Sequence, residues 1–161
     1  MLRFETAIGA CGISWSPTGL TRVSILGGGT SGEEPPEFVR EAVAGIVALL
    51  EGEPRDLREV PLDLTGVEAF AAGVYAQARL VGPGELCTYG DLARAVGSPG
   101  GAQAVGRAMG SNPFPIVVPC HRVLSSTGAL HGFSAPGGIA TKRRMLEIER
   151  APGFTQQTLF A

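Results

Sequence analysis

The sequence has few of the residues on which several large protein classes depend. Its 161 residues include three cysteines, an odd number without CxxC spacing, and two histidines, so we expect neither a disulfide framework nor a zinc site. No apolar run approaches the length of a membrane span, and the first five residues lack the apolar core of a signal peptide. We therefore expect a protein of the reducing cytoplasm, with no metal, no cofactor and no membrane partner.

Net charge is also small. At −2 it argues against nucleic acid as a partner, but the charges are unevenly distributed. Residues 1–86 hold 6 arginines and 12 acidic residues, whereas residues 87–161 hold 7 basic and 3 acidic residues. A basic second half suggests a polyanion partner on that side, although chance segregation would give the same pattern. Apolar residues, at 44%, indicate a globular chain of one domain or two small ones.

The first half of the chain predicts a small α/β scaffold without a catalytic cluster. Short β-leaning runs come first, with a hairpin turn at Ser16-Pro17-Thr18-Gly19, and Cys11 is expected in the core. The Pro35-Pro36 pair then opens a helix with a broad apolar face, and an edge strand follows around Pro61. The expected strands cover residues 6–8, 11–16, 21–26 and 60–64, and the expected helix ends at residue 50.

A capping box predicts the first helix of the second half. Thr65 and Glu68 have the spacing at which a hydroxyl and a carboxylate satisfy each other's backbone donors. Phe70, Val74 and Ala78 follow at helical spacing, so we expect them on one apolar face.

Two shorter helices are expected next. Thr88 and Asp91 form a second possible capping box, ahead of a helix at residues 91–96. Ser98-Pro99 predicts an N-cap and a first helical position for another helix, at residues 100–109. Two short helices joined by a tight turn indicate a helix-turn-helix, which by itself is a weak signal because many such pairs bind nothing.

The second of these helices is unusually rich in glycine and alanine. Because glycine is a poor helix former, we infer that small side chains are needed there, so that another helix or a nucleic-acid backbone can approach closely. Ala102 and Gly106 belong to this small-residue set. Gln103 and Arg107 stand four residues apart and share one face of the helix.

A reactive motif follows, Ile116-Val117-Val118-Pro119-Cys120-His121-Arg122-Val123. Its apolar start predicts a buried strand or extended segment, and the neighbouring histidine and arginine would lower the pKa of Cys120. In a regular strand Cys120 and His121 would point to opposite faces, so contact between them needs a turn or a bridging water, which Pro119 favours. The alternative is an inert buried cysteine beside an ion-paired arginine.

The chain ends with a glycine-rich loop at residues 128–138 and a helix at about 139–150, with Glu149 near its end. The order of all these features closely resembles the O6-alkylguanine-DNA alkyltransferases, also called methylated-DNA–protein-cysteine methyltransferases. The resemblance is dense from Phe70 to Glu149 and looser over the N-terminal strands. It implies an α/β fold, with a small RNase H-like subdomain at residues 1–64 and a mostly helical domain with the helix-turn-helix at residues 65–161.

The resemblance implies a role for each residue of the catalytic set. Cys120 resembles the alkyl acceptor, His121 the base that acts on it through a water, and Glu149 the carboxylate that orients the histidine. Asn112 resembles a hinge that ties the helix-turn-helix to the active site. Tyr89 resembles a tyrosine at the phosphate of the flipped nucleotide, where it can also aid proton delivery.

The resemblance also implies contacts with DNA and with the damaged base. Gln103 stands where the family usually has an arginine that fills the gap left by the flipped base, so Arg107 is the candidate substitute. Phe133 stands where members often have tyrosine, and Arg122 resembles a motif arginine that is more structural than chemical. The implied contacts are Ala102, Gln103, Gly106, Arg107, Pro115, Arg122, Ser126, Phe133 and Ser134; Pro115, Phe133 and Ser134 resemble pocket walls, and Ser126 a phosphate contact.

The implied activity is irreversible transfer of the alkyl group from O6-alkylguanine in double-stranded DNA to the protein's own cysteine, by a monomer. One alternative is a non-catalytic alkyltransferase-like protein that binds the lesion and signals to other repair factors; such proteins typically carry tryptophan in place of the cysteine. Another is an unrelated thiol hydrolase, which would need an oxyanion hole that nothing in the sequence marks.

Overall fold

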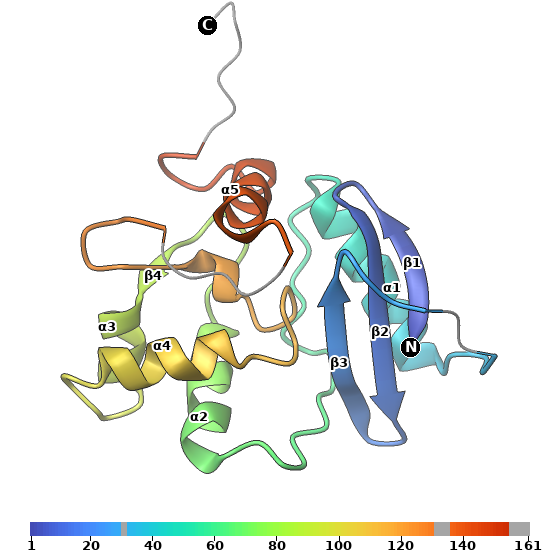
Figure 1. Ribbon diagram of the computed structural model, residues 1–161, viewed down its shortest axis with the longest axis horizontal. Coiled ribbons are helices and arrows are strands. Elements are labelled where there is room, and N and C mark those ends of the chain that lie inside the picture. The colour runs from blue at the N-terminus through green and yellow to red at the C-terminus, as the bar shows by residue number, and fades with distance from the viewer. Residues whose placement is uncertain (30–31, 131–135, 155–161) are drawn as a thin grey trace, which may run out of the picture.

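A computed structural model describes residues 1–29, 32–130 and 136–154. The chain begins with a three-stranded antiparallel sheet in the order β1 (Leu2–Thr6), β2 (Gly9–Ser16) and β3 (Gly19–Ile25). Helix α1 (Glu37–Leu50) covers one face of this sheet (Figure 1). Its buried positions follow helical spacing, which gives it the apolar face that the sequence predicts: Val39, Ala42, Gly45, Ile46, Leu49 and Leu50.

The hairpin prediction is confirmed, because Ser16 pairs with Gly19 across the turn between β2 and β3. The first strand lies earlier than predicted, at Leu2–Thr6, where every second residue is partly buried. The strand predicted at residues 60–64 is wrong. The described backbone there makes only a single parallel bridge between Leu62 and Leu20, flanked by hydrogen bonds from Leu20 N to Pro61 O (2.9 Å) and from Asp63 N to Leu20 O (2.8 Å).

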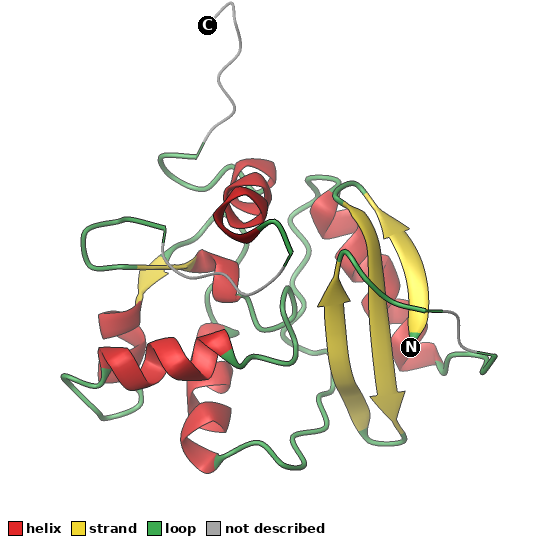
Figure 2. Cartoon of the chain, viewed as in Figure 1, coloured by secondary structure: helices red, strands yellow, loops and turns green. Residues whose placement is uncertain are grey.

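The second half consists mainly of helices, with one small parallel pair of strands (Figure 2). The short strand β4 (Cys87–Thr88) pairs with β5 (Val123–Leu124), and this pair joins the helices to the reactive motif. A single turn of 3-10 helix, η1 (Cys120–Arg122), leads into β5. The helices are α2 (Ala69–Ala78), α3 (Tyr89–Ala95), α4 (Ala102–Gly110) and α5 (Gly138–Ile148).

One of the two predicted capping boxes forms. Thr88 accepts from Asp91 N (3.0 Å) and Asp91 accepts from Thr88 N (2.9 Å), so α3 begins at Tyr89, two residues earlier than predicted. The box predicted at Thr65 is wrong. Thr65 N donates instead to Asp63 (3.0 Å) in a tight turn, and α2 begins only at Ala69.

The link between α3 and α4 also differs from the prediction. Ser98 and Pro99 do not start the helix; α4 begins at Ala102, with Gly101 as its N-cap. Gly101 N donates to Ser98 O (2.8 Å), and Gly100 has a φ of 86°, so a turn occupies these positions. The two helices nevertheless lie against each other as the sequence predicts, and α2 packs on α4.

The larger of two apolar clusters in the described chain joins its two halves. It includes Ile13 and Val23 from the sheet, Val105 from α4, and Val118 from the segment before Cys120. Val23 N also donates to Pro113 O (2.9 Å), which ties β3 to that segment. The sheet and α1 therefore support the reactive motif directly. Among the described residues, no helix is long and apolar enough to cross a membrane.

Candidate active site

A tight turn, and not the predicted strand, precedes Cys120. Val118 N donates to Phe114 O (2.8 Å), and Pro115 and Val118 form an isolated bridge. Ile116, within the turn, has a φ of 76°, a conformation that β-branched residues rarely adopt. The segment is buried, as expected, but its backbone is bent and strained.

Asn112 holds this turn from both ends. Its Nδ2 donates to Val118 O (3.0 Å), and its Oδ1 accepts from Phe114 N (2.9 Å). Because the turn leads directly into η1, these two hydrogen bonds help to fix the position of Cys120.

Cys120 and His121 lie in a 3-10 turn, so they are not forced to opposite faces as in a strand. Both are buried; Cys120 retains 8% of its surface and His121 none. Burial raises the pKa of the Cys120 thiol, and this outweighs the lowering effects of the Asn112 side chain and of Lys142. The sequence-based prediction of a lowered pKa is therefore wrong for the free protein.

A buried carboxylate links His121 to Arg122. Glu149, the C-cap residue of α5, accepts hydrogen bonds from three nitrogen atoms: His121 Nε2 lies 2.9 Å from Oε2, and Arg122 Nε and Nη2 donate to Oε1 (2.8 Å) and Oε2 (2.9 Å). Burial opposes ionisation of Glu149, but His121 and Arg122 together outweigh it and lower its pKa to about 2. The carboxylate is therefore ionised throughout the neutral range.

His121 has one nitrogen available for proton transfer. Burial lowers its pKa despite the opposing effect of Glu149, so the imidazole is neutral at neutral pH. Since Nε2 faces a carboxylate, which accepts hydrogen bonds, the ring proton belongs on Nε2 and the lone pair on Nδ1. Nδ1 is buried and has no hydrogen-bond partner among the described residues. A buried acceptor without a partner among the described residues, on the residue that follows Cys120 in the chain, is suited to take up a proton.

Arg122 lies inside the protein and not on its surface. Besides its two bonds to Glu149, it donates from Nη1 to Val81 O (2.7 Å), at the end of the segment after α2. Its guanidinium is thus fully engaged with the protein, and it orients the carboxylate.

Tyr89, the first residue of α3, lies close enough to Cys120 for the charge of a thiolate to act on it. Burial is the main cause that raises the pKa of its hydroxyl, which stays protonated at neutral pH. The ammonium of Lys142 lies over its ring, 6.0 Å from the centroid.

Lys142 was not identified from the sequence. It is 1% exposed, and its Nζ donates to Val123 O (2.7 Å). The available signal was its place on α5, because Lys142 shares an apolar stripe with Met145 and Leu146 and stands seven residues before Glu149. Lysine seldom buries its ammonium, so this spacing alone does not predict that Lys142 is inside the protein.

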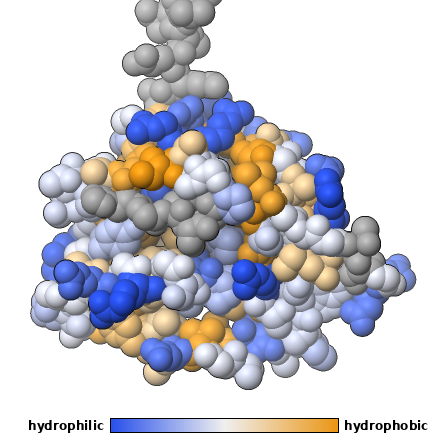
Figure 3. Space-filling view, in the orientation of Figure 1, coloured by the Kyte–Doolittle hydropathy of each residue, from blue (hydrophilic) through white to orange (hydrophobic). Residues whose placement is uncertain are grey.

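The implied DNA contacts lie at the surface of α4 or near it. Gln103 and Arg107 are exposed, while Ala102 and Gly106 are half-buried. Among the described residues, no atom lies within 4 Å of a Cβ built at Gly106, so the face of the helix at this position is open. Hydrophilic residues colour much of the α3–α4 side in the space-filling view (Figure 3).

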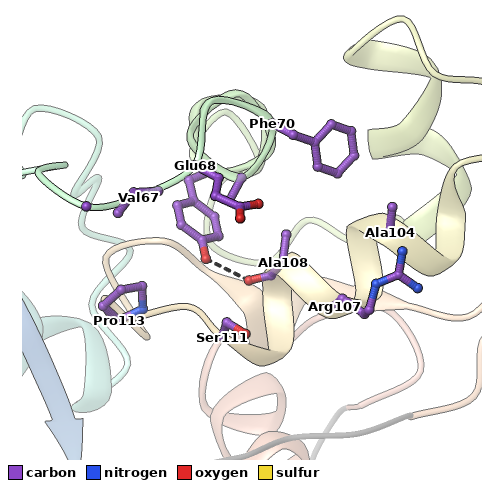
Figure 4. Close-up of a pocket in the computed structure, with 11 residues that line it drawn as sticks. Val67, Glu68, Phe70, Ala104, Arg107, Ala108, Ser111 and Pro113 are labelled. Atoms are coloured by element: carbon purple, nitrogen blue, oxygen red, sulfur yellow. Dashed lines mark hydrogen bonds between the residues drawn. The ribbon is translucent and has the colours of Figure 1, made fainter.

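A groove of about 440 Å³ runs between α4 and the start of α2. Arg107 lies on the α4 side of this groove, across from Glu68 and Phe70 (Figure 4). Tyr75 also lines the groove, and its hydroxyl donates to Ala108 O at 2.7 Å. Phe70 is 38% exposed here, so it does not pack into the core as its helical spacing led us to expect.

The remaining implied contacts are only partly placed. Pro115 is half-buried in the turn before Cys120, and Ser126 is exposed after β5. Phe133 and Ser134 lie outside the described residues. In the part of the chain that the structure describes, no cluster of three or more histidine, cysteine or acidic side chains could hold a metal ion.

Comparison with known proteins gives consistent matches over this site. The family model for the DNA-binding domain of 6-O-methylguanine DNA methyltransferase matches residues 69–151. The methylated-DNA–protein-cysteine methyltransferase of Mycolicibacterium paratuberculosis is 39% identical over 131 residues, which is 81% of this chain and 77% of the relative. The protein of the same name from Methanosarcina acetivorans is 34% identical, over 91% of this chain and 95% of the relative.

A solved structure extends the match to three dimensions. The crystal structure of Mycobacterium tuberculosis OGT in complex with DNA aligns with a TM-score of 0.74 at 33% identity, over 94% of each chain. The mixed α/β architecture described above is therefore that of a known group of structures.

Proposed function

Because this chain belongs to the methylated-DNA–protein-cysteine methyltransferase family, we propose that Cys120 is the cysteine that receives the alkyl group. The protein repairs DNA directly, by moving the alkyl group of O6-alkylguanine in DNA onto a cysteine of its own, and DNA with this lesion is its partner. The observation that carries the assignment is the place of Cys120 beside His121, whose ring is bonded to Glu149 and keeps Nδ1 available.

His121 is the base in this reaction. In the free protein burial favours the protonated thiol and the neutral imidazole, so the thiol still holds the proton that His121 is proposed to take up. Nδ1 then takes the proton of Cys120 through a bridging water, and the ionised Glu149 stabilises the resulting imidazolium. Arg122 acts as a positioning residue, because it holds both oxygens of Glu149.

The thiolate displaces guanine from the alkyl carbon. A sulfur–carbon bond forms as the carbon–O6 bond breaks, and the electron pair stays on the guanine, which takes up a proton as it leaves. The Tyr89 hydroxyl, protonated and close to Cys120, is our candidate for the donor. A thioether is stable, so each molecule reacts once.

We assign α3 and α4 to a helix-turn-helix that docks α4 on DNA through Ala102, Gln103, Gly106 and Arg107. The open, small-residue face of α4 supports this assignment, since it allows close approach to a narrow minor groove. The damaged base must leave the stack to reach the buried sulfur. Ser126 is the proposed phosphate contact, and Pro115, Phe133 and Ser134 the proposed walls of the base pocket.

The finer description of the fold is also a proposal. Three antiparallel strands followed by α1 support an RNase H-like subdomain at residues 1–64, with the helical domain at residues 65–161. We expect a cytoplasmic monomer. A non-catalytic lesion-binding role is not favoured, because the reactive cysteine and its histidine are both present.

Single-turnover transfer from free O6-benzylguanine tests the residue roles. We expect no transfer in Cys120→Ser, and in His121→Gln a rate at neutral pH lower by about 10²-fold or more, which recovers as rising pH ionises the thiol. Cys87→Ser is the control, because burial raises the pKa of Cys87 to about 12 and makes its thiol inert. Full activity in Cys120→Ser, or an unchanged pH profile in His121→Gln, would reject these assignments.

A further inference from the structure

The buried ammonium of Lys142 takes no part in the reaction steps proposed for Cys120, His121 and Tyr89. Lys142 reaches from α5 to donate to the carbonyl of Val123, the residue that directly follows η1. The side chain is 1% exposed, and its ammonium lies over the ring of Tyr89. Lys142 therefore contacts the segments that carry both the proposed acceptor and the proposed proton donor.

The hydrogen bond to Val123 does not by itself need a charge, because a neutral donor could also satisfy that carbonyl. Moving an ammonium out of water is costly, and burial lowers the pKa of Lys142 accordingly. A lysine at this place therefore suggests that its positive charge acts on the neighbouring groups.

In the described part of the chain, the ionisable groups that interact with Lys142 come from three elements. Cys120 and His121 belong to η1, Cys87 to β4 and Tyr89 to α3, and Asp91 acts on Cys87 in turn. The charge of Lys142 favours the thiolate of Cys120 against the effect of burial, and it also favours the neutral form of His121. Both effects favour the reaction, because the neutral His121 can accept a proton and the Cys120 sulfur loses its proton more readily.

We propose that Lys142 is a positioning residue for alkyl transfer. Its ammonium, held by the carbonyl of the residue that follows η1, stabilises the Cys120 thiolate. The inference rests on the proposed role of Cys120. It predicts an effect of charge that is separable from the hydrogen bond to Val123.

The test is the pH dependence of two reactions at Cys120: alkylation by iodoacetamide, followed by peptide mass, and benzyl transfer from free O6-benzylguanine. Lys142→Met removes the charge and the donor, whereas Lys142→Gln removes the charge and keeps a donor. Arg144→Met is the matched control, because it removes one exposed positive charge from the same helix. Thermal unfolding verifies that each variant is folded.

In both Lys142 variants we expect the midpoint of both profiles to rise by about one pH unit or more, so that the rates near neutral pH fall about tenfold. The high-pH plateau should approach that of the wild type, and Arg144→Met should keep the wild-type midpoint. If Lys142→Met does not fold, Lys142→Gln decides alone.

An unchanged midpoint in a folded variant would overturn the inference, and so would a plateau lowered at every pH without a shift, which would indicate a structural role. Absence of benzyl transfer in the wild type would instead reject the proposed function. The iodoacetamide profile would still report on Lys142 in that case, so the two failures are distinguishable.

Discussion

Single residues in this site depend on one another because their charges are buried together. Glu149 is shared by His121 and Arg122, and in the described chain neither residue has a hydrogen bond to another carboxylate. Removing one member of such a group leaves a buried charge without its partner. The free energy lost is typically larger than the net stabilisation that the intact ion pair provides. The site should therefore respond to pH and to substitution as a unit.

Glu149→Gln should show this dependence in the free energy of unfolding. We expect a loss of about 3–5 kcal/mol near neutral pH, because Arg122 keeps its buried charge. The native pKa of Glu149, about 2 against an ordinary value of 4.5, gives stability that is present above pH 4.5 and lost as pH falls towards 2. The difference in the free energy of unfolding between wild type and variant should thus narrow by about 2 kcal/mol when the pH falls to about 3. Urea unfolding at each pH measures this difference. A gap that stays constant with pH would contradict the assigned ionisation.

Gln103 should limit repair at the step in which the base leaves the helix. Glutamine has no charge and less reach than arginine, so we expect Gln103→Arg to raise the repair rate on duplex DNA. The rate with free O6-benzylguanine should stay nearly unchanged, since a free base needs no flipping. Equal effects on both substrates would show that this position acts on chemistry or folding.

Arg107 stands one helical turn from Gln103 and is equally exposed. We expect Arg107→Ala to lower the duplex rate and to reduce the dependence of DNA binding on salt concentration, because one cation near phosphate is lost. An unchanged salt slope, measured by titration with fluorescent duplex, would exclude Arg107 from the interface.

At the scale of elements, the sequence correctly predicted those features that depend only on interactions between neighbouring residues. The Thr88–Asp91 box and the Ser16–Gly19 hairpin need only neighbours in the chain, and both form as predicted. The segment from Ile116 to Val118 was wrongly predicted as a strand or extended segment, because its turn is fixed by Asn112 and by the core around Ile116. Periodicity carries no information about such contacts, nor about the carbonyl that holds Lys142.

Thr88 and Ser98 offer a comparison between a cap that forms and one that does not. Thr88→Ala should destabilise the protein by about 1 kcal/mol, because the backbone N–H of Asp91 loses the Thr88 hydroxyl that accepts its hydrogen bond. Ser98→Ala should have an effect well below that, since Gly101 and not Ser98 caps α4. Equal losses in thermal unfolding of the two variants would contradict the cap assignment.

At the scale of the whole molecule, the proposed division at residue 64 separates two parts that share one core. Val23 in β3 and Val118 before the reactive turn belong to the same cluster, and the bond from Val23 N to Pro113 O crosses between the parts. The helical part carries the proposed chemistry, but the sheet packs against the segment that precedes Cys120.

A fragment of residues 65–161 tests this dependence. We expect it to lack a cooperative unfolding transition, because it would expose the apolar surface that now packs on β3 and α1. The full chain is the control in the same circular-dichroism melt. A fragment that melts cooperatively and reacts with O6-benzylguanine would show that the helical part is independent.

The central claim is that Cys120 itself receives the alkyl group. The most direct measurement is the intact and peptide mass of the protein after incubation with excess duplex that contains O6-methylguanine. We expect one added methyl group per molecule, located on the peptide that contains Cys120, and none in Cys120→Ala. A wild-type mass that stays unmodified, or a methyl group located on Cys11 or Cys87, would contradict the account.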